Sequence, residues 1–296
     1  MITRGIAYIL IATLSFAVMN MMAKGLSAFH PMQVVFFRAF GTFAFIFPFM
    51  LYQRISIIGQ EPKFLLLRGV VGVISLATFF MALQRIPLGS AISIRYLGPI
   101  FGAIYASYFL KEKVKGWQWI SFLIAFSGVL LLKGFDVRID YFSLLLVLIS
   151  ALFVGMVFVL IRYLSAKEHH LTIINYFMVT SILGSLFFIQ HWRMPIGEEW
   201  WTVVLIGIFG LIGQVFMTKA FKTEETSVLA PFKYMELVWA LLMGYYFLEE
   251  TYSWLPFVGI LLIILGMLIN VYAKNRPGRG PQTELTPSER LPTVYK

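Results

Sequence analysis

The chain has 296 residues, of which 59% are hydrophobic and only 13% are charged, and it contains no cysteine. An ordinary soluble domain carries about 25% charged residues, so this composition excludes a soluble protein and indicates many membrane spans. The lack of cysteine excludes a disulfide framework, a thiol nucleophile and a cysteine metal site. The net charge of +10 is interpreted as cytoplasmic loop charge before any affinity for nucleic acid.

Ten apolar runs are long enough, at about 20 residues, to cross the hydrocarbon core of a bilayer as helices. Charged, proline and glycine clusters bound these runs, which we predict at 5–24, 33–52, 65–84, 88–110, 117–133, 141–163, 171–189, 201–221, 227–248 and 253–272. The first run lacks a small-residue cleavage site and leads into further spans, so we interpret it as a helix and not as a signal peptide. The tail at 274–296 is rich in proline, glycine and charge and is expected to be disordered.

The distribution of Lys and Arg among the loops predicts the orientation in the membrane. With the N-terminus inside, eleven of these residues lie at cytoplasmic ends and five lie outside, the outer five being Lys24, Arg85, Lys133, Arg138 and Arg193. We therefore expect both termini in the cytoplasm, with the protein in a plasma or inner membrane. This asymmetry also removes the reason to expect nucleic acid as a partner.

The chain contains an internal repeat with an offset of 138 residues. The segment 92–112, ISIRYLGPIFGAIYASYFLKE, matches 230–250, APFKYMELVWALLMGYYFLEE, so that Arg95 corresponds to Lys233. We predict two copies of five helices at 1–136 and 137–273, followed by the tail. An odd number of helices puts the second copy into the membrane upside down, and inverted repeats of this kind place a binding site near the midplane.

These two copies resemble the EamA domains of the drug/metabolite transporter superfamily. In each copy the fourth helix ends in a leucine-acid corner (FLKEK and FLEET), and the fifth has a glycine near its end (SGVLLLK and LGMLINVY). The resemblance covers about residues 5–273 and implies a ten-helix basket that works by alternating access, with a cavity lined chiefly by helices 1, 3, 4, 6, 8 and 9. Pro99 corresponds to Leu237, and Pro231 to Ser93, so the prolines give no basis for assuming that the two copies bend alike.

Arg95 and Lys233 are the first candidates for substrate binding. Each lies about 10 Å deep, from opposite faces of the membrane, at a rise of 1.5 Å per residue. A charge at the helix centre costs about 2.5–3.5 kcal/mol, so such residues normally face a cavity. Pro99 cannot donate to the carbonyl of Arg95, which favours a kink there. Both cations are predicted to bind an anionic group; the alternative is that neighbours neutralise them or that they snorkel to an interface.

Glu236 lies one helical turn beyond Lys233 and corresponds to Gly98, so it has no counterpart in the first copy. An i, i+3 pair on one face can form an internal salt bridge with Lys233. Alternatively, Glu236 exchanges protons or competes with substrate for Lys233, which would make it the coupling residue.

Other polar residues in the spans are weaker candidates. Arg38 interrupts an aromatic run, and we expect it in the outer vestibule or paired with a helix terminus. Gln214 in GLIGQVF is predicted to line the cavity, because a lone amide in lipid needs partners. Tyr96 and Tyr234 are candidates for hydrogen bonds to cargo. The same role is considered for four small polar residues that more often stabilise contacts between helices, namely Ser15, Asn20, Ser75 and Thr78.

Enzymatic function is not expected, because HExxH, GxSxG and Walker A motifs are absent from the sequence. The adjacent His169 and His170 do not face one ligand point on a helix, so neither a metal nor another cofactor is expected. We predict a secondary-active transporter of a small anionic or zwitterionic solute, such as an organic acid or amino acid. The alternatives are a broad-specificity exporter of amphiphilic or cationic compounds with Glu236 as counter-ion, and a non-transporting scaffold or membrane enzyme. The expected partners are the solute, membrane lipid and protons.

Overall fold

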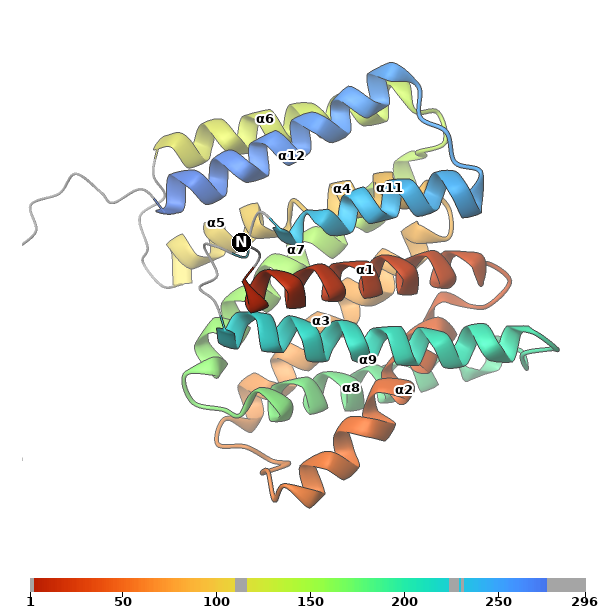
Figure 1. The fold of residues 1–296 in the computed structure, drawn as a ribbon, viewed down its shortest axis with the longest axis vertical. Coiled ribbons are helices and arrows are strands. Elements are labelled where there is room, and N and C mark those ends of the chain that lie inside the picture. The colour runs from red at the N-terminus through yellow and green to blue at the C-terminus, as the bar shows by residue number, and fades with distance from the viewer. Residues whose placement is uncertain (1–2, 110–115, 224–228, 230–231, 276–296) are drawn as a thin grey trace, which may run out of the picture.

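The computed structural model describes residues 3–109, 116–223, 229 and 232–275, and all regular structure in these ranges is helical (Figure 1). The first copy comprises α1 (Arg4–Gly25), α2 (Pro31–Tyr52), α3 (Pro62–Leu83), α4 (Leu88–Arg95), α5 (Gly98–Phe109) and α6 (Gly116–Phe135). The second comprises α7 (Tyr141–Ser165), α8 (His170–Leu186), η1 (Ile189–His191), α9 (Glu199–Thr223), α11 (Met235–Leu248) and α12 (Trp254–Asn275). The predicted disordered tail lies outside the described residues, apart from 274 and 275.

Five helices are long and apolar enough to cross a membrane by length and composition, namely Arg4–Gly25, Pro31–Tyr52, Pro62–Leu83, Tyr141–Ser165 and Glu199–Ala220. Four shorter apolar helices accompany them, at Trp119–Phe135, His170–Leu186, Met235–Leu248 and Trp254–Ile269. Large hydrophobic side chains such as Leu123 and Leu130 are more than 70% exposed, as expected for a surface that faces lipid. The prediction of an all-α integral membrane protein is confirmed.

The helix contacts follow a two-fold pattern between the copies. Helix α1 packs against α9 and α11, and the equivalent helix α7 packs against α3 and α5. The pairs α6–α12, α4–α11 and α2–α8 each join equivalent helices; Figure 1 shows α6 and α12 side by side at the top. Exchanging the two copies therefore reproduces these contacts, which is the arrangement expected of inverted repeats.

Glycines allow the closest of these approaches. A Cβ added at Gly128 would lie 2.6 Å from the carbonyl oxygen of Gly259, and one added at Gly266 would lie 2.7 Å from that of Ser121. Gly128 corresponds to Gly266, and Ser121 to Gly259, at the offset of 138 residues. The same contact is thus made twice between α6 and α12, where small residues let two backbones meet.

The spans predicted at 88–110 and 227–248 are not single helices. Helix α4 ends at Arg95 and α5 begins at Gly98, while Lys233 precedes a turn at Tyr234 and α11 begins at Met235. Although the prolines differ, both copies break at equivalent positions, Tyr96 and Tyr234. Pro99 explains the first break.

The second break has Leu237 at the position of Pro99, and its hydrogen bonds differ. The Leu237 N–H donates to the carbonyl of Tyr234 at 3.0 Å, three residues back, which leaves the Lys233 carbonyl without that donor. The Tyr96 hydroxyl of the first copy donates to this carbonyl at 2.9 Å. A side chain from one broken helix therefore satisfies the backbone of the other, as irregular backbone at membrane depth requires.

Candidate functional site

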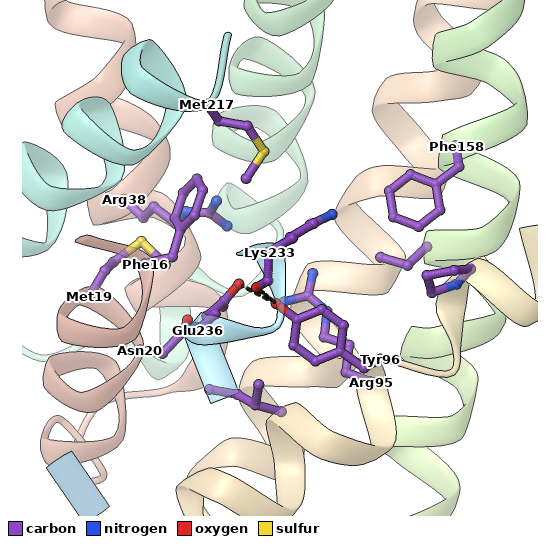
Figure 2. A pocket seen from close by; sticks show the side chains of 13 residues that line it. Phe16, Met19, Asn20, Arg38, Arg95, Tyr96, Phe158, Met217, Lys233 and Glu236 are labelled. Atoms are coloured by element: carbon purple, nitrogen blue, oxygen red, sulfur yellow. Dashed lines mark hydrogen bonds between the residues drawn. The ribbon is translucent and has the colours of Figure 1, made fainter. Parts of the chain in front are cut away.

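A cavity of about 170 Å³ lies where the two breaks meet (Figure 2). Its wall combines side chains from both copies, and the lining residues are Phe16, Met19, Asn20, Arg38, Ile92, Arg95, Tyr96, Pro99, Val154, Phe158, Met217, Lys233 and Glu236. The polar side chains gather between the breaks, while phenylalanine and methionine form much of the remaining wall. The cavity therefore offers a charged patch within an apolar enclosure.

Three cations reach this cavity, namely Arg38 on α2, Arg95 at the end of α4 and Lys233 before α11. Within the part of the chain that the structure describes, none of the three has a carboxylate within 4.0 Å or donates a side-chain hydrogen bond. The Arg95 guanidinium instead lies 4.1 Å from the ring centre of Phe79, and the Lys233 ammonium lies 5.0 Å from that of Phe158. Aromatic faces attract cations without consuming their hydrogen-bond donors.

Glu236, in the first turn of α11, is the one carboxylate among the described lining residues. It accepts hydrogen bonds from Asn20 Nδ2 at 3.2 Å and from the Tyr96 hydroxyl at 2.9 Å, both from the first copy. Among the described residues it forms no ion pair with Lys233 within 4.0 Å, because the turn at Tyr234 separates the two residues. The three cations and one carboxylate of the described lining give a formal excess of two positive charges.

The Tyr96 hydroxyl lies 2.9 Å from two acceptors, the Lys233 carbonyl and a Glu236 oxygen. A hydroxyl has one proton to donate and two lone pairs that accept. With Glu236 ionised, the two acceptors compete for that proton. With Glu236 protonated, its own O–H can donate to Tyr96, and Tyr96 can donate to Lys233. The geometry therefore accommodates both protonation states.

The predicted residues do not all reach the cavity. The structure brings Arg38, Arg95, Tyr96, Lys233 and Glu236 together, whereas Tyr234 and Gln214 are not part of its lining. Tyr234 is buried with its ring 5.2 Å from that of Tyr96, so it supports the wall from behind. Gln214 lies on α9, where its backbone carbonyl accepts a hydrogen bond from Thr218.

The lining also differs from the expected set of helices. Helix α3 contributes Phe79 behind Arg95 but no lining residue, while α2 contributes Arg38. Ser75 bonds to Ser150 between α3 and α7, and Ser15 and Thr78 bond to carbonyls of their own helices. Asn20 is the exception among these small polar residues, since its Oδ1 is buried without a hydrogen-bond partner among the described residues. Its position facing Glu236 at the start of α11 was not predictable from the sequence.

Residues 3–133 and 141–272 each match the model of the EamA-like transporter family. The chain belongs to this family. The two matched ranges together cover nearly the whole of the described structure, and each contains one of the broken helices. The predicted membership of the drug/metabolite transporter superfamily is confirmed, and the cavity lies between its two repeats.

Curated relatives in this family are transporters with different cargo. The chain is 30% identical to the pseudopaline exporter CntI of Pseudomonas aeruginosa, covering 89% of this chain and 94% of that protein. It is 27% identical to human solute carrier family 35 member G1 (88% and 76% covered) and 25% identical to the S-adenosylmethionine uptake transporter of Rickettsia felis (92% and 94% covered). A solved crystal structure matches with a TM-score of 0.63 at 18% identity, over 89% of this chain and 97% of that one, which shows the fold alone.

Proposed function

We propose that this EamA-family protein is a secondary-active, alternating-access transporter of a small solute that carries a carboxylate or another anionic group. The observation that carries the proposal is the pair Arg95 and Lys233, which face one cavity without a carboxylate partner among the described residues. Because an unpaired cation away from water is costly, a ligand anion would supply the missing partner.

The two cations would bind such a group in different ways. The planar guanidinium of Arg95 can donate two parallel hydrogen bonds to a carboxylate, while the Lys233 ammonium acts as a point charge. Helices α5 and α11 begin beside these residues, and the N-terminal ends of helices carry a partial positive charge that favours an anion. An anion would therefore be held between the two copies, where a change in their relative arrangement opens it to either side.

Glu236 would provide the coupling. Loss of its proton would create a carboxylate that competes with the bound anion for Arg95 and Lys233. Gain of a proton would remove that competition and favour binding of the cargo. The hydrogen bonds of Tyr96 fit either state, as described above. Proton exchange at Glu236 would then alternate with cargo binding at the same site.

The orientation with both termini in the cytoplasm, in a plasma or inner membrane, belongs to this proposal and rests on the positions of Lys and Arg. One relative is named as an exporter and another as an uptake transporter. The direction of transport in this protein would therefore be set by the gradients of the solute and the protons. The names of both relatives support a small-metabolite cargo.

One observation favours the second candidate, an exporter of cationic or amphiphilic compounds. Glu236 and the unpartnered Oδ1 of Asn20 are acceptors, and the wall contains Phe16, Phe158 and Met217. A cation with an apolar body would fit such a wall. In that case Glu236, and not the cation pair, would be the principal contact.

Thermal stabilisation of the purified protein followed by transport assays tests the proposal. A ligand that binds the folded state raises its unfolding temperature by mass action. We would screen organic acids and amino acids against the matching amides and esters, which lack the carboxylate charge, and then measure counterflow of the stabilising solutes in proteoliposomes. Saturable counterflow of acids but not of their amides is expected. Counterflow of cationic compounds alone would favour the second candidate, and no saturable exchange of any solute would reject transport.

A further inference from the structure

A second polar cluster lies at the end of the molecule where α1 ends and the α11–α12 loop begins, to the right in Figure 1. Its centre is Glu250, which is only 7% exposed. The Glu250 carboxylate accepts the Leu88 N–H at 2.9 Å and lies 3.3 Å from the Lys24 ammonium. Lys24 also donates to the backbone carbonyls of Leu83 and Ile86. One largely buried ion pair thus joins α1, the α3–α4 connection and the α11–α12 loop.

Tyr252 extends this cluster. Its hydroxyl donates to Glu250 at 3.1 Å and accepts the Gly89 N–H at 3.1 Å. The Arg138 guanidinium from the α6–α7 loop lies 5.2 Å from the Tyr252 ring centre. We call Lys24, Glu250, Tyr252 and the N–H groups of Leu88 and Gly89 the latch.

Every helix that meets at the latch has another part in the cavity. Helix α1 carries Lys24 and, one turn earlier, Asn20, which donates to Glu236. Helix α11 begins beside the cavity with Glu236 and ends beside Glu250. The third helix that meets at the latch is α4, which is the shortest of the three.

Helix α4 has eight residues, so it is about 12 Å long at 1.5 Å per residue. Its first two N–H groups are held in the latch, and its last residue is Arg95. All residues from Leu88 to Ile94 are buried. Such a short, enclosed helix moves as a rigid unit, so a displacement at Leu88 carries Arg95 with it.

We propose that the latch is the gate that closes this end of the transporter, and that Glu250 is a positioning residue that sets Arg95 through α4. This proposal rests on the alternating-access function proposed above. In the latched state the carboxylate holds α1 and α4 against the α11–α12 loop. Release of Glu250 from Lys24 and Leu88 lets these elements separate and opens the cavity to that side. Removing one partner of a buried ion pair strongly destabilises the state in which the pair forms. The latched state should therefore require both the Lys24 and the Glu250 charge.

Single-cysteine labelling tests the latch in the full chain within its membrane, because the natural sequence has no cysteine. Met19→Cys places the reporter on a cavity residue that is 2% exposed. Val137→Cys, on a residue that is 95% exposed in the α6–α7 loop, identifies which side of the membrane the latch faces. A membrane-impermeant thiol reagent is then applied to intact cells and to inside-out vesicles, without cargo.

Glu250→Gln and Lys24→Met are each expected to raise the labelling rate of Met19→Cys about tenfold from the latch side. Tenfold corresponds to a shift of about 1.4 kcal/mol between closed and open states. Tyr252→Phe should raise the rate less, since it removes one hydroxyl and no charge. The matched control is Glu249→Gln, which removes a neighbouring exposed carboxylate and should leave the rate unchanged.

An unchanged labelling rate in both Glu250→Gln and Lys24→Met, with monodisperse protein, would overturn the latch. An equal rise in Glu249→Gln would also overturn it. Labelling needs no cargo, so the two proposals fail separately. Normal counterflow with no labelling response rejects the latch alone, whereas the expected labelling response with no counterflow of any solute rejects the transport proposal alone.

Discussion

The Tyr96 hydroxyl of the first copy lies 2.9 Å from a carboxylate oxygen of Glu236 in the second. This bond crosses from one broken helix to the other, and the same hydroxyl reaches the Lys233 carbonyl. The two breaks are therefore held in register by one side chain. Any movement that separates the copies at the cavity must first change the partners of Tyr96.

Glu236→Gln should abolish the dependence of transport on a pH gradient while preserving counterflow. The amide keeps the size of the side chain and can still accept from Tyr96, but it cannot gain or lose a proton in this range. Gradient-driven uptake and counterflow would be compared in the same proteoliposomes. Glu249→Gln, at an exposed carboxylate, serves as the control. A variant with the wild-type pH profile would assign Glu236 to a structural role.

Arg95→Ala and Lys233→Ala should each remove measurable transport and weaken binding of the anionic cargo by about 10- to 100-fold. A hydrogen bond to a charged group contributes about 1.5–3 kcal/mol, which gives that range. Cargo affinity would be measured from the shift in unfolding temperature with ligand concentration. Arg85→Ala removes an exposed cation outside the cavity and should behave as wild type. Wild-type transport in both cavity variants would rule out the site.

Gly98→Ala should destabilise the protein by about 1–3 kcal/mol, the usual range for overpacking. A Cβ at Gly98 would lie 2.1 Å from Val154 Cγ1 of α7, so one of the two must move. The unfolding temperature in detergent measures the effect. Val154→Ala removes the obstructing methyl groups, and the double variant should recover most of the lost stability. Two purely additive losses would show that the contact is not the cause.

The pair Glu61 and Lys167, which joins the start of α3 to the α7–α8 loop, predicts a pH dependence of stability outside the membrane spans. The hydrogen bond from Lys167 lowers the pKa of Glu61 below its ordinary value of 4.5, and the reciprocal bond raises the pKa of Lys167 to about 12. The stabilisation is therefore present between these limits. It is lost as pH falls through the lowered pKa of Glu61, and as pH rises from 10.5 through about 12.

Lys167→Met should accordingly lower the unfolding temperature slightly at pH 7, because exposed pairs contribute little. The difference from wild type should shrink as the pH is taken below 4.5. Lys63→Met, at a neighbouring exposed lysine, should show no such convergence. A difference that stays constant down to acid pH would contradict the assignment to this pair.

Much of the fold was predictable because the membrane imposes span length and the repeat imposes symmetry. The span predicted at 5–24 is the helix Arg4–Gly25, and that at 141–163 is Tyr141–Ser165. The break in the second copy was not predictable, since Leu237 occupies the position where Pro99 marks the first break. It depends on the Tyr96 hydroxyl, which arrives from 137 residues away to satisfy the Lys233 carbonyl.

The site was predictable in its charges and less so in its geometry. Arg95, Lys233 and Glu236 were found because charge in an apolar span needs a reason. Gln214 satisfied the same criterion but lies outside the lining, because the rotation of a helix about its axis is set by packing, which the local sequence does not encode. Arg38, a weaker substrate-binding candidate expected in the outer vestibule or paired with a helix terminus, reaches the cavity itself.

The paired glycine contacts between α6 and α12 have a consequence for the transport cycle. In the proposed alternating-access cycle, a contact that is made twice in equivalent form, as Gly128 with Gly259 and Gly266 with Ser121, would be the same in the inward-open and outward-open forms. The contact between α1 and α11 has no such property, because exchange turns it into that between α7 and α5. If the protein works by the proposed cycle, a cross-link across Gly128 and Gly259 is expected to preserve transport, whereas one between α1 and α11 is expected to stop it. The α6–α12 contact would then keep its geometry throughout the cycle while the other helices move.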